Sequence, residues 1–129
     1  MAGYHRRACY HADQYFLDNL YLTLSNNNTD PAYPTQRNVL SLHASEDLRR
    51  WRHVATLLED DSELSHEDSI RLTGFQYVDW QCDGDGIVYL VRTAYDGAHN
   101  FHDANRITFH QIEDFRSLPG CAVGAGRAD

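Results

Sequence analysis

The sequence contains little of what marks a disulfide scaffold, a zinc protein or a membrane protein. It has three cysteines, Cys9, Cys82 and Cys121, and this odd number at wide spacing gives neither a disulfide framework nor a paired-cysteine zinc site. Buried or incidental thiols are therefore expected. No apolar run approaches the ~18 residues of a membrane span, and Arg6-Arg7 is not followed by the apolar region of a signal peptide. The chain as written predicts a soluble protein without an export signal of its own.

Basic residues are also scarce. The chain has 11 Lys and Arg against 19 Asp and Glu, for a formal net charge of −8, and the basic residues are scattered. Nucleic-acid backbones require clustered positive charge, so a general nucleic-acid binder is excluded. A neutral or cationic partner suits this composition better.

The residues that are abundant favour one globular domain rich in strands. A chain of 129 residues is long enough to bury a core, and hydrophobic residues make up 42% of it. Eight Tyr, five Phe and two Trp add to the strand tendency, because aromatic and β-branched residues fit a pleated surface. Disorder is expected only at the termini.

One segment occurs twice. Residues 43–49 (HASEDLR) are echoed by residues 110–116 (HQIEDFR) at an offset of 67, and five of the seven positions are identical or both bulky and apolar. The echo extends upstream, where 20–25 lies at nearly the same distance before 88–93. Each copy is predicted to contain an apolar strand, a loop, a second strand and an acidic turn.

Alternation of short apolar runs with turn residues indicates antiparallel strands in both copies. In the first copy, a four-stranded sheet is predicted with strands at residues 15–17, 20–24, 38–44 and 54–58. A polar, acidic linker at 59–73 follows and has room for one short helix, with Ser65 or Ser62 as its N-cap.

The second copy is predicted to be incomplete. Its strands are expected at 75–81, 87–93 and 105–112, and the first two flank the turn Asp83-Gly84-Asp85-Gly86, a strong hairpin signal. The fourth strand is missing, and the small residues of 119–126 predict a flexible tail over 119–129.

Repeated four-stranded sheets of this kind are typical of propeller blades. The turn Ser45-x-Asp47-Leu48-x-x-Trp51 resembles the S-x-D-x-x-x-W turn of sialidase-like and arabinanase-like glycoside hydrolases. In such a turn Ser and Asp bind backbone N–H groups, and Trp51 is expected to pack between sheets.

The stretches 74–80, 92–95 and 99–110, together with Arg37-Asn38, look like the C-terminal part of bacterial sialidase-like, five-bladed propeller proteins. The resemblance spans about residues 10–118. It implies an all-β chain with two four-stranded antiparallel blades, the second incomplete, at about 10–58 and 74–118. Such proteins carry further blades upstream, so the chain is expected to be a fragment or to complete its sheets with other copies.

The resemblance also implies that a sugar binds where blades converge. On that basis Asp79, Arg92 and Asp103 are predicted as catalytic residues, and Arg37, Tyr77, His99, Asn100, His102 and Arg106 as substrate-binding residues. Arg92 ends a strand whose Val88 and Leu90 share its face, a position from which an arginine can grip a carboxylate. Alternative roles stay open: Asp79 bracing a loop, Tyr77 in the core, and ordinary salt bridges for Arg37 and Arg106. No metal and no cofactor are expected.

The function expected from these features is a carbohydrate-active propeller fragment related to glycoside hydrolases, and not catalytically complete alone, because hydrolysis needs two suitably spaced carboxyl groups. The alternatives are a non-catalytic glycan-binding module and a structural protein that oligomerises through open strand edges. The expected partners are a carbohydrate and either further copies or missing upstream blades, with no nucleic acid and no membrane. The resemblance suggests a secreted or periplasmic protein.

Overall fold

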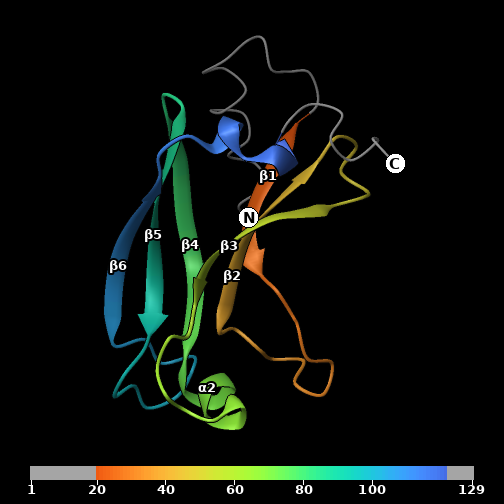
Figure 1. Cartoon of the computed structure of the whole chain (residues 1–129). Helices are drawn as coiled ribbons and strands as arrows, with labels where there is room; N and C mark the ends of the chain where they lie inside the picture. Colours follow the sequence, from red (N-terminus) through yellow and green to blue (C-terminus); the bar gives the residue numbers. More distant parts are fainter. Residues whose placement is uncertain (1–19, 122–129) are drawn as a thin grey trace.

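The computed structural model describes residues 20–121, and this part of the chain is mostly β (Figure 1). It forms two three-stranded antiparallel sheets, each with its strands in sequence order. A short helix joins the sheets, and two 3-10 helices follow the last strand. The first sheet contains β1 (Tyr21–Asn26), β2 (Val39–Ser45) and β3 (Arg52–Glu59); α2 (His66–Leu72) follows; the second contains β4 (Gly74–Asp83), β5 (Gly86–Ala94) and β6 (Arg106–Ile112), before η2 (Phe115–Ser117) and η3 (Pro119–Cys121).

The predicted strands and the observed ones agree for all six described strands, so the mostly β character is confirmed. The four-stranded count is not matched, because each described sheet has three strands. The additional strand expected at residues 15–17 lies outside the described residues. In the second sheet three strands were expected, and three are found.

The core lies between the two sheets. Alternation along β1 and β2 buries Leu22, Leu24 and Leu42 on the face that meets the second sheet, and Trp80 and Tyr89 pack against them from β4 and β5. Full burial of such side chains contributes about 1.5–3 kcal/mol each. The sheets are thus joined by an apolar layer that leaves the opposite face of the second sheet outside the core.

Two local predictions are confirmed. Ser65 is the N-cap of α2, and its hydroxyl accepts a hydrogen bond from the Asp68 N–H at 3.2 Å. The turn between β4 and β5 is a tight hairpin in which Asp83 pairs with Gly86, and Gly84 takes a φ of 64° that favours glycine.

The acidic turn of the first copy is built as expected, apart from its tryptophan. Ser45 Oγ accepts from the Leu48 N–H at 2.8 Å, and Asp47 Oδ1 accepts from the N–H groups of Arg49 and Arg50 at 2.8 and 2.9 Å. Trp51 was expected between the sheets. Instead it lies exposed at the surface, where its indole N–H reaches the Leu48 carbonyl.

The segment after β6 differs from the flexible tail expected from residue 119. It forms η2 and η3 and crosses from the second sheet towards the first (Figure 1). Phe115 and Cys121 are fully buried, and the Gly120 carbonyl accepts a hydrogen bond from Arg52 at 2.7 Å. The rest of the predicted tail, 122–129, lies outside the described residues.

The cysteines differ in state. Cys121 is a buried free thiol, and burial raises its pKa to about 11. Cys82 is disulfide-bonded, so the expectation of unpaired thiols is wrong for this residue. Within residues 20–121, no helix combines the length and apolar character that crossing a membrane requires.

Candidate functional site

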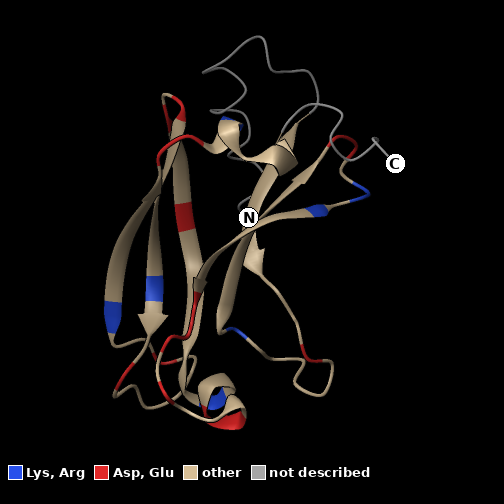
Figure 2. Cartoon of the chain, viewed as in Figure 1, with Lys and Arg blue, Asp and Glu red and all other residues tan. Residues whose placement is uncertain are grey.

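Polar side chains gather where β4 and β5 meet the loop of residues 95–105. This loop joins β5 to β6, at the lower end of the second sheet in Figure 1. Figure 2 shows basic bands on β5 and β6 near this end, whereas acidic residues lie on the connecting loops, on α2 and in a band on β4. We call the group formed here by Tyr77, Arg92, Asn100, His102 and Asp103 the Tyr77 cluster.

Tyr77 is the centre of the cluster. The pairing of β4 with β5 shifts between Gln76 and Asp79, and within this irregularity Tyr77 has a φ of 54°. A positive φ is costly for an aromatic residue and is often found at functional sites. The side chain is 66% exposed, and the Arg92 guanidinium carbon lies 5.2 Å from the centre of its ring. The bulge therefore presents an exposed ring with a cation stacked on it.

The loop contributes the other three members of the cluster. Asn100 Oδ1 accepts hydrogen bonds from the N–H groups of His102 and Asp103 at 2.8 and 2.7 Å, and its amide donates to Asp103 Oδ2 at 3.0 Å. His102 Nδ1 lies 3.3 Å from Asp103 Oδ1. The His102 ring meets the Tyr77 ring edge-on, with 6.4 Å between centres. The loop is thus folded so that its imidazole stands beside the tyrosine and its carboxylate beside that imidazole.

The carboxyl group of Asp103 is held in its charged form. The hydrogen bond with His102 and then that from Asn100 place the pKa of Asp103 below its ordinary value, and the nearby His99 adds a smaller electrostatic effect. An ionised carboxylate has lone pairs for several donors, and its two neighbours occupy only part of that capacity. Asp103 can therefore accept hydrogen bonds from a bound molecule.

A close backbone contact fixes the loop to the sheet. A Cβ atom added to Gly74 would lie 2.4 Å from the Phe101 carbonyl oxygen, so only glycine fits here. The same oxygen accepts from the Gln76 amide at 2.8 Å, and the Phe101 N–H donates to the Arg71 carbonyl at 2.8 Å. Sequence reasoning missed Gly74 and Gln76, although a glycine at the start of a strand signals a close approach of backbones.

We expect Gly74→Ala to destabilise the protein by about 1–3 kcal/mol and to weaken ligand binding at the Tyr77 cluster, because the added methyl group displaces Phe101. Chemical denaturation measures the first effect and titration calorimetry the second. Gly84→Asn is the matched control, since nothing lies within 4 Å of the Cβ position there and Asn tolerates a positive φ. Unchanged binding by a stable Gly74→Ala protein would contradict the role given to this contact.

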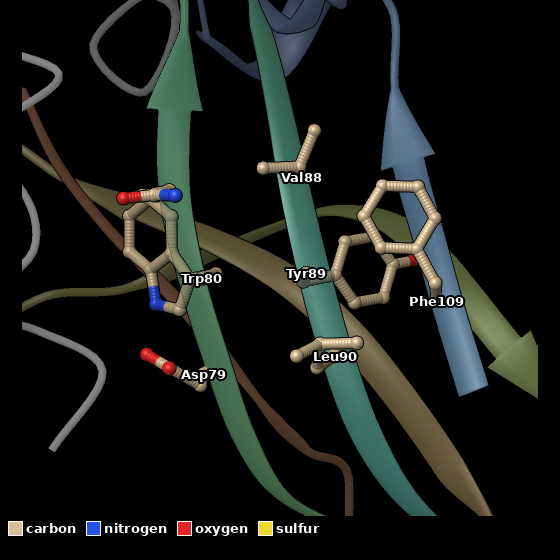
Figure 3. A pocket seen from close by; sticks show the side chains of 7 residues that line it. Asp79, Trp80, Val88, Tyr89, Leu90 and Phe109 are labelled. Carbon is tan, nitrogen blue, oxygen red and sulfur yellow. The ribbon is translucent and has the colours of Figure 1, made fainter. Parts of the chain in front are cut away.

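Asp79 lies outside the Tyr77 cluster. Asp79 pairs with Leu90 of β5, and both lie on the exposed face of the second sheet. There Asp79 lines a hollow of about 180 Å³ together with Gln81, Val88 and Phe109 (Figure 3). The sequence placed Asp79 and Tyr77 on one face, and both are exposed.

Arg37 and Arg106 are not brought to the cluster either. Arg37 precedes β2, where its guanidinium donates to the Gln36 carbonyl and its own carbonyl accepts from the Phe75 N–H. Arg106 stacks on Tyr95 at 5.3 Å and borders a cleft of about 230 Å³ between the sheets. Sequence reasoning also missed the hydrogen bond from the Tyr95 hydroxyl to Asp61 at this cleft.

The loop of residues 95–105 contains two histidines and two aspartates, residue types that can bind a metal ion. Within residues 20–121, no three His, Cys, Asp or Glu side chains are placed to hold a metal ion together. Asp103 is held by His102 and Asn100, and His99 is exposed. The contacts observed within the cluster are hydrogen bonds, ring contacts and the approach of Arg92 to the Tyr77 ring.

Comparison with known proteins does not identify the chain: neither the protein-family scan nor the searches of curated proteins and solved structures found a match. The resemblance to sialidase-like propellers thus stays a prediction that depends on the motifs quoted above. The function of the site has to be argued from its own chemistry.

Proposed function

We propose that the chain binds an acidic carbohydrate, such as a sialoside, at the Tyr77 cluster, where Arg92 supplies a local positive charge although the net charge of −8 favours a neutral or cationic partner for the chain as a whole. The observation that carries the proposal is the Arg92 guanidinium stacked 5.2 Å above the exposed Tyr77 ring and accompanied by an ionised carboxylate on the adjacent loop. A guanidinium stacked on a ring keeps its in-plane N–H donors available. Those donors match the two oxygens of a sugar carboxylate in a bidentate pair.

The other members of the cluster suit the rest of a sugar. The exposed ring of Tyr77 offers an apolar surface for the C–H face of a pyranose, and its hydroxyl group offers a polar end. Asp103 accepts hydrogen bonds from sugar hydroxyl groups, and His102 either donates or accepts according to its tautomer. One charged anchor, one flat apolar surface and several fixed polar groups are the usual elements of a small-molecule site.

Binding without hydrolysis fits this site better than catalysis. Most glycosidases use two carboxyl groups, and sialidases, which use a tyrosine nucleophile, are an exception to this pattern. A carboxyl group that serves as the general acid has a raised pKa, so that it holds a proton near neutral pH. The environment of Asp103 lowers its pKa. We therefore favour a glycan-binding module over a hydrolase that is complete within this chain.

Titration calorimetry with a sialylated trisaccharide and with neutral lactose tests the proposal. We expect binding of the sialylated sugar, at least about tenfold weaker binding of lactose, and loss of binding in Tyr77→Ala, because the carboxylate and the ring supply separate parts of the affinity. An aryl sialoside assayed across pH tests hydrolysis. Equal affinity for both sugars would overturn the acidic preference, and turnover of the sialoside would overturn the non-catalytic function.

We also propose that the two sheets are neighbouring blades of a five-bladed propeller related to sialidase-like proteins. Support comes from the sequential antiparallel order of strands in both sheets, the apolar layer between them and the hydrogen-bonded Ser45-Asp47 turn. In such a propeller, further blades would come from a longer chain or from other copies. Whether or not further blades are present, the two sheets within residues 20–121 position the residues of the Tyr77 cluster.

A secreted or periplasmic location is proposed as well. The disulfide at Cys82 supports it, because such bonds persist mainly in oxidising compartments. The family resemblance pointed to the same location.

A further inference from the structure

The cleft that Arg106 borders lies between the two sheets. Residues of β3 from the first sheet and of β4, β5 and β6 from the second line it, together with the segments that follow β3 and β5, and it measures about 230 Å³. A cavity of about 150 Å³ holds a benzene molecule, so this cleft has room for one ring and a short chain. We call it the Arg106 cleft. Because it lies between the sheets, it is not on either of the outward faces that further blades would cover.

The inner part of the Arg106 cleft suits an apolar group. Phe75 of β4 belongs to the core between the sheets, and Leu58 of β3 packs against that core. Among the polar side chains of the cleft, Thr93 Oγ1 and Thr108 Oγ1 lie 2.8 Å apart, and Thr108 Oγ1 lies 2.8 Å from His110 Nε2. These hydroxyl and imidazole groups already bind one another, so an apolar group can enter without leaving them unpaired.

Charges of both signs lie at the end of the cleft nearest the loop of residues 95–105. The Arg106 guanidinium carbon lies 5.3 Å from the centre of the Tyr95 ring, and the Tyr95 hydroxyl donates a hydrogen bond to Asp61. One charge therefore lies over the face of the ring and the opposite charge at its hydroxyl edge. Within residues 20–121, Arg106, Asp61 and Glu59 form no ion pair, although all three line the cleft. The tyrosine ring keeps the opposite charges apart.

The electrostatic potential at the hydroxyl edge of Tyr95 is negative. The hydrogen bond to Asp61 raises the pKa of Tyr95, and desolvation and the charges of Asp61, Asp60 and Asp96 add to this effect. Each of these charges is a carboxylate, so a cation is favoured at this edge. Over the face of the ring, Arg106 donates one hydrogen bond, to the Asp96 carbonyl at 3.2 Å, and its other N–H groups are available to an anion.

We propose that the Arg106 cleft binds a free aromatic α-amino acid. Its carboxylate pairs with Arg106, and its ammonium group pairs with Asp61 and Glu59. Its ring lies against Leu58 and Phe75, where the volume of the cleft allows one ring on a short chain. An α-amino acid carries both charges on one carbon atom, so it can bridge a guanidinium and a carboxylate that a single ring holds apart.

Other classes of ligand use the cleft less well. A simple amine leaves Arg106 without a partner, and a simple carboxylic acid meets two carboxylates. A sugar fits poorly, because its hydroxyl groups would lose water against Leu58 and Phe75. Within a peptide, an internal residue carries neither charge of the head group and a terminal residue only one. The free amino acid alone among these ligands uses every part of the cleft.

The Arg106 cleft is separate from the Tyr77 cluster. Residues 106, 108 and 110 alternate along β6 and share the face that meets the core, as the stacking of His110 on the buried Tyr89 shows. Arg92 pairs with Ile107, which is exposed on the outward face. The two proposed sites thus lie on opposite faces of the second sheet, and the amino-acid site does not depend on the glycan site.

Titration calorimetry of the whole chain with three ligands that share a phenyl ring tests the proposal. L-phenylalanine carries both charges, phenethylamine lacks the carboxylate, and 3-phenylpropionate lacks the ammonium group. We expect L-phenylalanine to bind with a dissociation constant on the order of 0.1 mM and the other two at least about tenfold more weakly, since each loses one charged contact. No binding of L-phenylalanine at about 10 mM, roughly a hundred times that constant, would overturn the proposal. Equal affinity for either of the other ligands would overturn the requirement for both charges.

Arg106→Gln and Glu59→Gln test the two charged contacts separately. Arg106→Gln should weaken binding of L-phenylalanine at least about tenfold but should not weaken binding of phenethylamine, which has no carboxylate for Arg106. Glu59→Gln should weaken binding of L-phenylalanine about three- to tenfold, because Asp61 still pairs with the ammonium group, and should not weaken binding of 3-phenylpropionate. Both side chains are exposed, so unchanged circular dichroism is expected.

Glu63→Gln is the matched control, since it removes the same charge from an exposed position of the same linker, outside the cleft. It should leave the affinity for L-phenylalanine unchanged. Equal weakening by Glu63→Gln and Glu59→Gln, or by Arg92→Gln and Arg106→Gln, would show that net charge governs binding and would overturn the assignment to this cleft. Binding of the sialylated sugar is measured separately, so the outcome for one proposal does not decide the other.

Discussion

Replacing Phe115 by alanine is expected to lower the free energy of unfolding by about 3–5 kcal/mol, the range for removing a buried aromatic side chain. Phe115 has no exposed surface and belongs to the core cluster that joins the two sheets. Its N–H also donates to the Asp85 carbonyl at 3.1 Å, which ties η2 to the hairpin between β4 and β5. Urea denaturation followed by circular dichroism measures the loss. The slope of the free energy of unfolding against urea concentration should be the same for both proteins if each unfolds in one step.

The matched control is Leu48→Ala, at the position that corresponds to Phe115 in the first copy of the repeated segment. Leu48 is 54% exposed, so we expect a change within about 0.5 kcal/mol. Equal losses for the two variants would mean that the segment after β6 does not pack as described. Intact stability of Phe115→Ala would have the same meaning.

The different surroundings of Leu48 and Phe115 have a local cause. In the first copy, Ser45 Oγ accepts from the Leu48 N–H and holds the turn in a form where Leu48 has a φ of 68°. The second copy has Ile112 in place of Ser45, and Asp114 makes no side-chain cap to η2. Without the serine, the chain continues into a 3-10 helix that turns Phe115 into the core. Similar sequence thus marks an equivalent position in the chain, but the turn that follows differs where Ile112 replaces the capping Ser45.

Much of the β framework could be predicted, because its signals are local. Alternation located the described strands, Gly84 marked the hairpin, and one of the two candidate caps, Ser65, lies at the start of α2. The packing of residues 119–121 could not be predicted in this way. Its small and flexible composition favours a loose tail, and its order comes from contacts such as Arg52 with the Gly120 carbonyl, 68 residues apart in sequence.

The candidate site was predictable to a similar degree. Strand alternation placed Arg92 on one face with Val88 and Leu90, and the density of polar residues marked the loop that holds His102 and Asp103. Their approach to Tyr77 depends on Gly74 meeting the Phe101 carbonyl, a contact between segments with no shared pattern. Arg106 was predicted as a substrate-binding residue from its place at the start of a strand, but it does not lie in the cluster. The same position also allows the stacking on Tyr95 that is observed.

Replacing Arg92 by glutamine is expected to weaken binding of a sialylated sugar by about 10- to 100-fold. Hydrogen bonds to charged groups contribute about 1.5–3 kcal/mol, and each 1.4 kcal/mol is a factor of ten in affinity. Glutamine keeps a polar side chain of moderate length but loses the charge, the fork of donors and the stacking on Tyr77. Titration calorimetry at fixed salt concentration measures the change, and added salt should weaken wild-type binding because the ion pair is exposed.

Two further variants separate the role of Arg92 in recognition from a general effect of charge. Arg92→Lys keeps the charge but loses the planar fork, so it should recover only part of the affinity. Arg106→Gln removes an arginine that is also stacked on a tyrosine, at 5.3 Å against 5.2 Å for Arg92, but at the cleft between the sheets. It should leave sugar binding unchanged. Affinity for neutral lactose should differ little among all these proteins, because lactose has no carboxylate for Arg92 to hold. Equal weakening by Arg92→Gln and Arg106→Gln would show that net charge governs the affinity, and the Tyr77 cluster would then no longer explain it.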